Sequence, residues 1–187
     1  MNKLLLIFLA LFPLVVCAEL TYGELEKLST TPEQLEGHFE QEKYISALSV
    51  SLKSSGNFSY QRGQALHWQT IVPIQHELMM TRETITNRQG DNELIRLDVS
   101  SNPALQVISE LFFSVLTAEW QGLERFFKLS SGSNENGQWV AELLPIDTVI
   151  TQFADRVMLQ GDSLLREVTI YEKSGDYTKI RFDDLKQ

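Results

Sequence analysis

The sequence predicts a single α+β domain built around an antiparallel sheet. Alternating strand patterns fill the chain from about residue 41 to residue 97, and a helical pattern follows over residues 103–127. Strand patterns then return and continue almost to the C-terminus. Runs of strands separated from runs of helices are typical of α+β domains, whereas a parallel βαβ array alternates the two.

The first 18 residues have the pattern of a secretory signal peptide. Lys3 precedes an apolar run that is too short for a membrane span of about 20 residues. Val16 and Ala18 occupy the positions that signal peptidase reads, so we expect cleavage after Ala18 and a periplasmic protein. Lipidation is the competing interpretation, because Cys17 follows Leu14 at lipobox spacing, but Val16 is larger than the residue typical before a lipidated cysteine.

Composition limits the function classes open to residues 19–187. This length suits one domain with a sizeable core, and neither a repeat nor a low-complexity linker divides it. Without Lys3 the chain has 15 basic and 25 acidic residues, a net charge of −10 with neutral histidines. Such acidity disfavours binding to nucleic acids and to anionic lipid surfaces. Cleavage would also remove Cys17, the only cysteine, and a thiol-free chain suits an oxidising compartment.

Short helices are expected first, at residues 22–28 and 32–37, with Thr31 as a cap before Pro32. Period-two alternation then predicts a series of strands. These lie at residues 41–52, 56–61, 66–72 and 74–81, with shorter fragments at 85–87 and 94–97.

Residues 46–73 contain the clearest strand signal in the chain. One side of these strands is almost entirely apolar, which is typical of half-buried antiparallel strands. The apolar side comprises Leu48, Val50, Leu52, Phe58, Tyr60, Leu66 and Trp68. Arg62 shares the parity of Phe58 and Tyr60, so a strand continuing that far would direct its guanidinium toward the apolar side.

The helix predicted over residues 103–116 has an unusually wide apolar stripe. Asn102 is expected to cap it and Pro103 to open it. Apolar residues recur at spacings of three and four, and others widen the stripe beyond the roughly 100° of an ordinary surface helix. These residues are Leu105, Val107, Ile108, Leu111, Phe112, Phe113, Val115 and Leu116. Gly122 is expected to separate a second short helical piece.

The last third of the chain predicts a meander of strands at residues 127–130, 138–144, 152–160, 163–172 and 177–182. Gly161-Asp162 has the composition of a two-residue hairpin turn. Such a turn would pair Leu159 with Leu164, Val157 with Arg166 and Phe153 with Ile170, and would set Arg156 opposite Glu167.

The spaced residues of this chain resemble the LolA family, the periplasmic carriers of outer-membrane lipoproteins. The similarity includes a Phe-x-Gln element (Phe39 and Gln41), a Gly-x-Phe element before a strand (Gly56 and Phe58), and the later Pro73. It extends over residues 21–185, including the central helix and the final meander. Two features depart from the family pattern: Gly63 replaces a proline after Arg62, and residues 81–84 replace an Asp-Gly hairpin.

The resemblance implies a strongly curved antiparallel sheet that forms an incomplete β-barrel, with helices as a lid over the opening. Apolar side chains of the sheet and lid would line a cavity for acyl chains. The candidate lining is Leu48, Val50, Leu52, Phe58, Tyr60, Leu66, Trp68, Leu78, Met80, Ile108, Leu111, Phe112 and Val115. The family's motif arginine corresponds to Arg62, which would latch the lid of the empty form. A solvent-exposed arginine at a strand end is the alternative.

Other candidate sites are weaker. His38, His67 and His76 are the only histidines, and they lack the spacing of a metal site, so no metal or other cofactor is expected. Asp147, Asp155 or Asp162 could be combined with Ser163 and a histidine for hydrolysis, but no G-x-S-x-G motif is present, so the chain is not expected to be an enzyme.

The expected function is therefore that of a periplasmic carrier of acylated cargo, such as a lipoprotein, acting as a monomer. Its partners would be an inner-membrane transporter and an outer-membrane acceptor. Two alternatives remain open. The same half-barrel could serve as a lipid-sensing or interaction module, and lipidation of Cys17 would make the chain an outer-membrane-anchored acceptor of the related LolB type.

Overall fold

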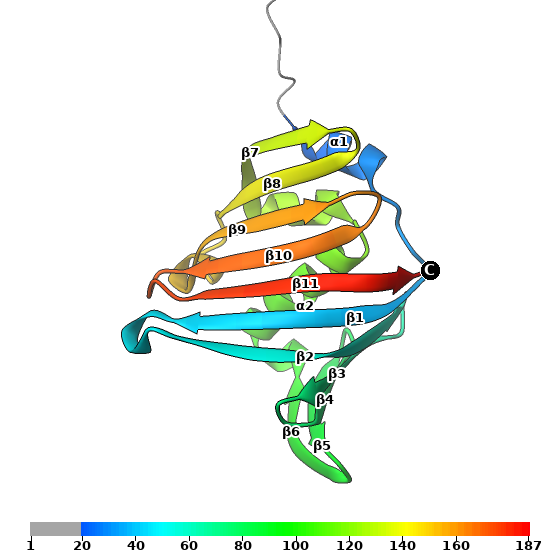
Figure 1. Cartoon of the computed structure of the whole chain (residues 1–187), viewed down its shortest axis with the longest axis vertical. Coiled ribbons are helices and arrows are strands. Elements are labelled where there is room, and N and C mark those ends of the chain that lie inside the picture. Colours follow the sequence, from blue (N-terminus) through cyan, green and yellow to red (C-terminus); the bar gives the residue numbers. More distant parts are fainter. Residues whose placement is uncertain (1–19) are drawn as a thin grey trace, which may run out of the picture.

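The computed structural model describes residues 20–187, except for the side chains of Pro103, Ala104, Val107, Ile108 and Leu111. Its main feature is one antiparallel sheet of eleven strands with helices on one face (Figure 1). The strands are β1 (Gln34–Ile45), β2 (Val50–Gln61), β3 (Ala65–Val72), β4 (His76–Met80), β5 (Thr84–Gln89), β6 (Asn92–Asp98), β7 (Phe127–Glu135), β8 (Gln138–Pro145), β9 (Ala154–Gly161), β10 (Leu165–Glu172) and β11 (Tyr177–Lys186). The α-helices are α1 (Tyr22–Leu28) and α2 (Pro103–Leu116), and the 3₁₀ helices are η1 (Ser46–Leu48), η2 (Val99–Ser101), η3 (Trp120–Arg125) and η4 (Ile150–Gln152).

The strand order explains why a helix covers the sheet. Strands follow the order β6-β5-β4-β3-β2-β1-β11-β10-β9-β8-β7, so the first and last strands of the chain pair at the centre. The two edges, β6 and β7, are consecutive in sequence. The chain between them must therefore cross a face of the sheet, and it does so as α2 and η3, which lie behind the strands in Figure 1.

The predicted antiparallel α+β fold is confirmed, but the predicted barrel needs correction. The sheet is open and is not strongly curled, and β6 and β7 are not paired with each other. The covering helices are few and short: α2 has 14 residues and η3 has six. The fold is thus a twisted open sheet with one covered face.

Several predicted boundaries were wrong. Residues 32–37 do not form a helix, because β1 begins at Gln34 and directs Leu35 and Phe39 into the core. The strand predicted over residues 41–52 is interrupted by η1, after which Ser49 has a φ of 51°. The chain reverses there, so β1 and β2 form a long hairpin in which Ile45 pairs with Val50.

The β9–β10 hairpin has a different register from the predicted one. Leu159 pairs with Val168 and Val157 with Ile170, whereas Arg156 faces Tyr171. The difference arises at the turn, where the Asp162 carboxylate accepts a hydrogen bond from the Leu164 amide at 2.9 Å and lengthens the loop. A bulge between Leu165 and Glu167 adds a further shift.

Aromatic residues from distant strands form the centre of the core. Phe39 stacks on Trp68 with ring centroids 3.9 Å apart, and Phe58 and Phe182 contact the same cluster. A second cluster joins η3 to the sheet through Trp120 and Trp139, whose rings meet edge to face at 5.3 Å. Aromatic pairs of this kind add to the stabilisation from burial.

Helix α1 packs beside η3 next to the β7 edge. Thr21 and Glu24 form a capping box at its start. The Tyr22 hydroxyl donates to the Phe127 carbonyl oxygen at 3.1 Å, and burial raises the pKa of this tyrosine, with the Glu124 carboxylate adding to the effect.

Candidate functional site

A small apolar cavity lies between α2 and the sheet. Its volume is about 90 Å³, and its lining is almost entirely hydrocarbon. The lid side contributes Phe112, Val115, Leu116 and Leu123, and the sheet side contributes Phe127, Leu143, Val157, Leu165, Val168, Ile170, Ile180 and Phe182. The cavity therefore lies over the C-terminal strands β7 to β11.

Strand alternation positions these sheet residues. Val157, Ile170 and Thr178 are successive cross-strand partners on β9, β10 and β11, and Leu159, Val168 and Ile180 form the next row. Because alternate residues of a strand face opposite sides, each row presents its side chains to the same face. That face is the one that α2 covers.

The structure separates the predicted lining residues into groups. Phe112 and Val115 line the cavity. Phe58, Tyr60, Leu66, Trp68 and Met80 are buried in the neighbouring core, and Leu78 is partly buried against it. The side chains of Ile108 and Leu111 lie outside the part of the chain that the structure describes.

Leu48, Val50 and Leu52 lie outside the cavity, with exposed fractions of 68%, 42% and 55%. Val50 and Leu52 do share the face of Phe58 and Tyr60, as their parity predicts, because the β1–β2 ladder is regular. The long β1–β2 hairpin, however, projects beyond the helices (Figure 1). Leu48 lies in η1 at its tip.

The sheet residues that line the cavity were not identified from the sequence. These residues lie on β7 to β11, strands that were expected but were not assigned to the cavity. Val157 and Leu159 alternate with less apolar neighbours, as do Val168 and Ile170, and this pattern was a sufficient signal for a buried face. The sequence pattern does not reveal the order of the strands in the sheet. This order is needed to locate the cavity, because the pairing of β1 with β11 makes this face continuous with the face that contains Phe58.

Arg62 does not continue β2. It lies in a three-residue hairpin loop between Gln61 and Ala65, which are paired, and Gly63 takes a φ of 70° there. Its guanidinium donates to the Pro32 carbonyl oxygen at 3.3 Å and lies 3.4 Å from the Glu33 carboxylate. These partners precede β1 and are not part of α2. The inward direction inferred from strand parity is thereby corrected, whereas a latch function of Arg62 stays a prediction.

The closed cavity is too small for an acyl chain. Pockets that enclose small-molecule ligands commonly measure about 300–1,000 Å³, several times the 90 Å³ found under α2. A long-chain ligand could occupy this place only if α2 moved away from the sheet. In this conformation α2 therefore leaves only a small apolar space against the sheet.

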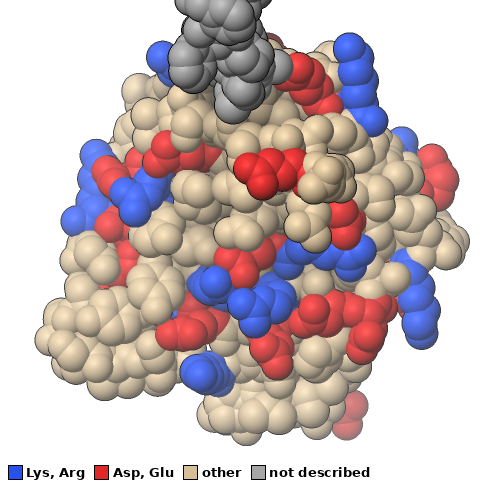
Figure 2. Space-filling model, turned by 45° about the horizontal axis from the view of Figure 1, so that its top comes forward, with Lys and Arg blue, Asp and Glu red and all other residues tan. Residues whose placement is uncertain are grey.

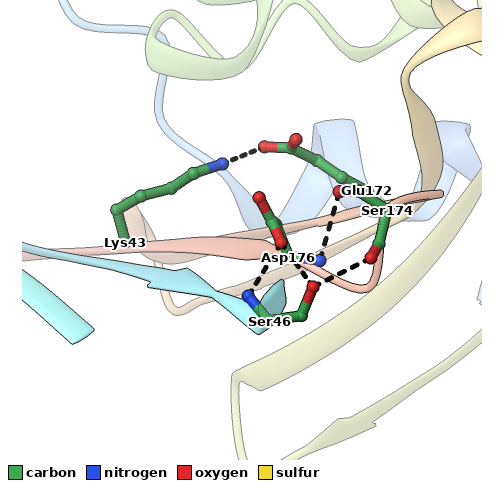
Figure 3. A network of polar contacts seen from close by, with 5 residues as sticks. All are labelled: Lys43, Ser46, Glu172, Ser174 and Asp176. Atoms are coloured by element: carbon green, nitrogen blue, oxygen red, sulfur yellow. Dashed lines mark hydrogen bonds and ion pairs between the residues drawn. The ribbon is translucent and has the colours of Figure 1, made fainter. Parts of the chain in front are cut away.

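A polar network fastens the outer end of the β1–β2 hairpin (Figure 3). The Ser46 amide and hydroxyl both donate to the Asp176 carboxylate, at 2.9 and 2.7 Å, and the same hydroxyl contacts the Ser174 carbonyl oxygen at 2.9 Å. The bond from the Ser46 backbone amide is the main cause that lowers the pKa of Asp176. Lys43 and Glu172 form an ion pair beside it.

Charges on the outer surface are mixed in sign. In the view of Figure 2, basic and acidic side chains lie next to each other instead of forming separate areas. Glu167, for example, contacts both Lys179 at 2.9 Å and Arg181 at 3.4 Å. The three histidines contact Asn57, Glu77 and the Ile74 carbonyl oxygen. Over residues 20–187, no three metal-ligating side chains come together.

A family model described as outer membrane lipoprotein carrier protein LolA matches residues 30–187. The chain belongs to the LolA family. The recognised resemblance is thus confirmed, and the family is one of carriers. None of the helices within the described residues is long and apolar enough to span a membrane.

Solved structures with a similar fold are distant in sequence. A LolA superfamily protein from Nitrosomonas europaea is 10% identical, with 88% of this chain and 90% of that chain covered and a TM-score of 0.44. A putative outer membrane lipoprotein-sorting protein domain from Vibrio parahaemolyticus is 12% identical, with 88% and 90% covered and a TM-score of 0.42. MucB in the MucA/MucB complex of Pseudomonas aeruginosa is matched at 14% identity, with 88% and 55% covered and a TM-score of 0.48. No curated protein matches the chain.

Proposed function

We propose that this LolA-family chain is a periplasmic carrier that shields the acyl chains of a lipoprotein, or of another acylated cargo, between the inner and outer membranes. The observation that supports this function is the cavity under α2, whose lining is almost entirely hydrocarbon. The cargo class is inferred from the family, which is described as an outer membrane lipoprotein carrier.

Physical chemistry explains why such cargo needs a carrier. Exposing an acyl chain to water costs about 0.8 kcal/mol per CH₂ group, so two or three chains cost tens of kcal/mol. Free diffusion through an aqueous compartment is therefore excluded. A sheet face lined by residues such as Val157, Val168 and Ile180 offers these chains an apolar surface without a chemical step.

The proposed cycle has two states. In the empty state α2 closes on the sheet, as in the structure, and the remaining cavity is too small for cargo. An inner-membrane transporter delivers the acyl chains as α2 moves outward, and Phe112 and Val115 then cover the cargo instead of the sheet. An outer-membrane acceptor that binds the chains more tightly completes the transfer, because exchange follows differential affinity.

Binding of a neutral apolar dye tests the proposal. The fluorescence of N-phenyl-1-naphthylamine should rise with the protein, and palmitate should displace it. Val168→Thr places a hydroxyl in the apolar cavity without changing the side-chain volume, and should weaken dye binding about fivefold or more. Val50→Thr is the matched control on the exposed part of the same face, and should leave binding unchanged.

An absence of dye binding to the wild-type protein would contradict the proposal. Equal losses in Val168→Thr and Val50→Thr would place the dye elsewhere and would also contradict it. Circular dichroism and unfolding midpoints of both variants check that the fold is retained.

A further inference from the structure

The two covering helices are held to the sheet very differently. In η3, Trp120 and Leu123 are 1% and 0% exposed, and Trp120 packs edge to face on Trp139 of the sheet. In α2, Leu116 at the C-terminal end is 5% exposed, whereas Phe112, Phe113 and Val115 are only partly buried. Moving η3 would separate the buried Trp120 and Leu123 from the sheet, so we assign η3 to the part of the fold that stays in place.

A sharp break separates the two helices. Helix α2 ends at Leu116, and η3 begins at Trp120. The Thr117 amide donates to the Phe113 carbonyl oxygen and the Glu119 amide to that of Ser114, both at 2.9 Å. Between them Ala118 has a φ of 56°, a left-handed conformation that is unfavourable for alanine. Residues 117–119 therefore form a defined joint between α2 and η3.

One ion pair crosses from the movable side of this joint to the fixed side. Glu110 of α2 contacts Arg125 at the end of η3. The Arg125 guanidinium also lies 4.6 Å from the centre of the Phe126 ring, which is buried in the core. A second, weaker contact joins α2 to the turn before β5, where the Ser109 hydroxyl donates to the Thr81 carbonyl oxygen at 3.4 Å.

The ion pair is accessible from outside. It borders an open recess of about 330 Å³ between α2, η3 and the turn before β5. The side chains of Arg125 and Glu110 are 57% and 48% exposed. Water, salt or a charged group of a partner can therefore reach the pair without first displacing α2.

We propose that Glu110 and Arg125 form a clasp that holds α2 closed, and that α2 opens by swinging about residues 117–119 while η3 stays in place. This inference rests on the proposed carrier function. It assigns the control of opening to α2 and η3, whereas Arg62 contacts the segment before β1. Opening requires the clasp to break, because its two residues lie on opposite sides of the joint.

A charge swap tests the clasp. Stopped-flow uptake of N-phenyl-1-naphthylamine is compared among the wild type, Glu110→Arg, Arg125→Glu and the double variant with both changes. An exposed ion pair of this kind changes an equilibrium by about two- to fivefold. Each single variant should therefore take up dye two to five times faster, and the double variant should return to the wild-type rate. Unchanged single variants, or a double variant with the summed effect, would overturn the clasp.

Salt provides an independent measurement on the same proteins. Raising the ionic strength screens exposed charges, so uptake by the wild type should accelerate toward the rate of the single variants. The single variants, which lack the attraction, should not accelerate. A parallel response of all four proteins would contradict the assignment.

Spin-label distances test the joint. Labels at Gln106 on α2 and Gln121 on η3 should change their separation when dye saturates the protein. Labels at Gln121 and Glu135 on β7 should keep theirs, because η3 is fixed to the sheet. A change in the second pair would show that η3 moves and would overturn the swing about residues 117–119.

The outcomes separate this inference from the proposed function. If the wild type binds no dye, the carrier function fails. If the wild type binds dye but takes it up at the same rate as the three charge variants, only the clasp fails.

Discussion

Gly63 and Gly23 both have open space where a Cβ atom would lie, but their backbones differ. Gly63 has a φ of 70° in the β2–β3 loop, whereas Gly23 lies in α1. Gly63→Ala should therefore destabilise the protein by about 1–2 kcal/mol through backbone strain alone. Gly23→Ala should stabilise it by about 0.5 kcal/mol, because alanine loses less backbone entropy in a helix. Urea unfolding measures both, and equal effects would contradict this explanation.

Asp176 makes part of the stability dependent on pH. The Ser46 backbone amide, followed by its hydroxyl, lowers the pKa of this carboxyl group in the folded state. Such a group stabilises the fold above its unfolded pKa of about 3.9, and the contribution is lost as pH falls through the lower folded pKa. Asp176→Asn should thus lower the unfolding midpoint at pH 7, and the difference from wild type should shrink below about pH 4. A constant difference down to pH 2 would contradict the assignment.

Substitution of Arg62 tests whether helix α2 is held closed by Arg62 or by the Glu110–Arg125 pair. Its contacts are the Pro32 carbonyl oxygen and the largely exposed Glu33 carboxylate. Because a surface ion pair contributes about 1 kcal/mol or less, Arg62→Leu should cost little stability. Its dye-uptake rate should stay within about twofold of wild type, below the change expected for Glu110→Arg. An acceleration larger than that of Glu110→Arg would support Arg62 as the latch instead of the Glu110–Arg125 pair.

At the scale of elements, Gly56 shows why a strand needs a glycine. A Cβ atom there would lie 1.8 Å from the Gln69 carbonyl oxygen, at the bulge where β2 and β3 change register. The obstacle is backbone, so it cannot rotate away. Gly56→Ala should destabilise the fold by at least about 3 kcal/mol, whereas Ser54→Ala on the same strand face should cost little. A well-folded Gly56→Ala protein with a wild-type melting temperature would contradict the close approach.

Element types followed from the sequence far better than their registers did. The alternation around Phe58 and Trp68 and the helical spacing of Phe112 and Val115 predicted β3, α2 and the second half of β2 correctly. Register failed where one side chain altered a turn, as Asp162 does in the β9–β10 hairpin. The helix predicted at residues 32–37 failed because the tertiary burial of Leu35 and Phe39 outweighed a local capping pattern.

At the scale of the whole molecule, topology decides where the site lies. Because β1 pairs with β11, the apolar faces of both meanders become one surface, and the chain from β6 to β7 must cross it. The sequence alone shows apolar faces but not their order. The predicted sheet lining therefore lay on η1 and β2 to β4, whose residues are packed core or exposed, while the open space lies over β7 to β11.

Native mass spectrometry of the protein isolated from cells that produce the full chain can show whether the chain carries an acylated molecule. If the apolar face under α2 carries acyl chains, the spectrum should contain an additional mass that corresponds to an acylated molecule. This mass should disappear under denaturing organic solvent and should be reduced in Val168→Thr but not in Val50→Thr. Detection of the bare polypeptide alone, with no acylated molecule released, would contradict this prediction.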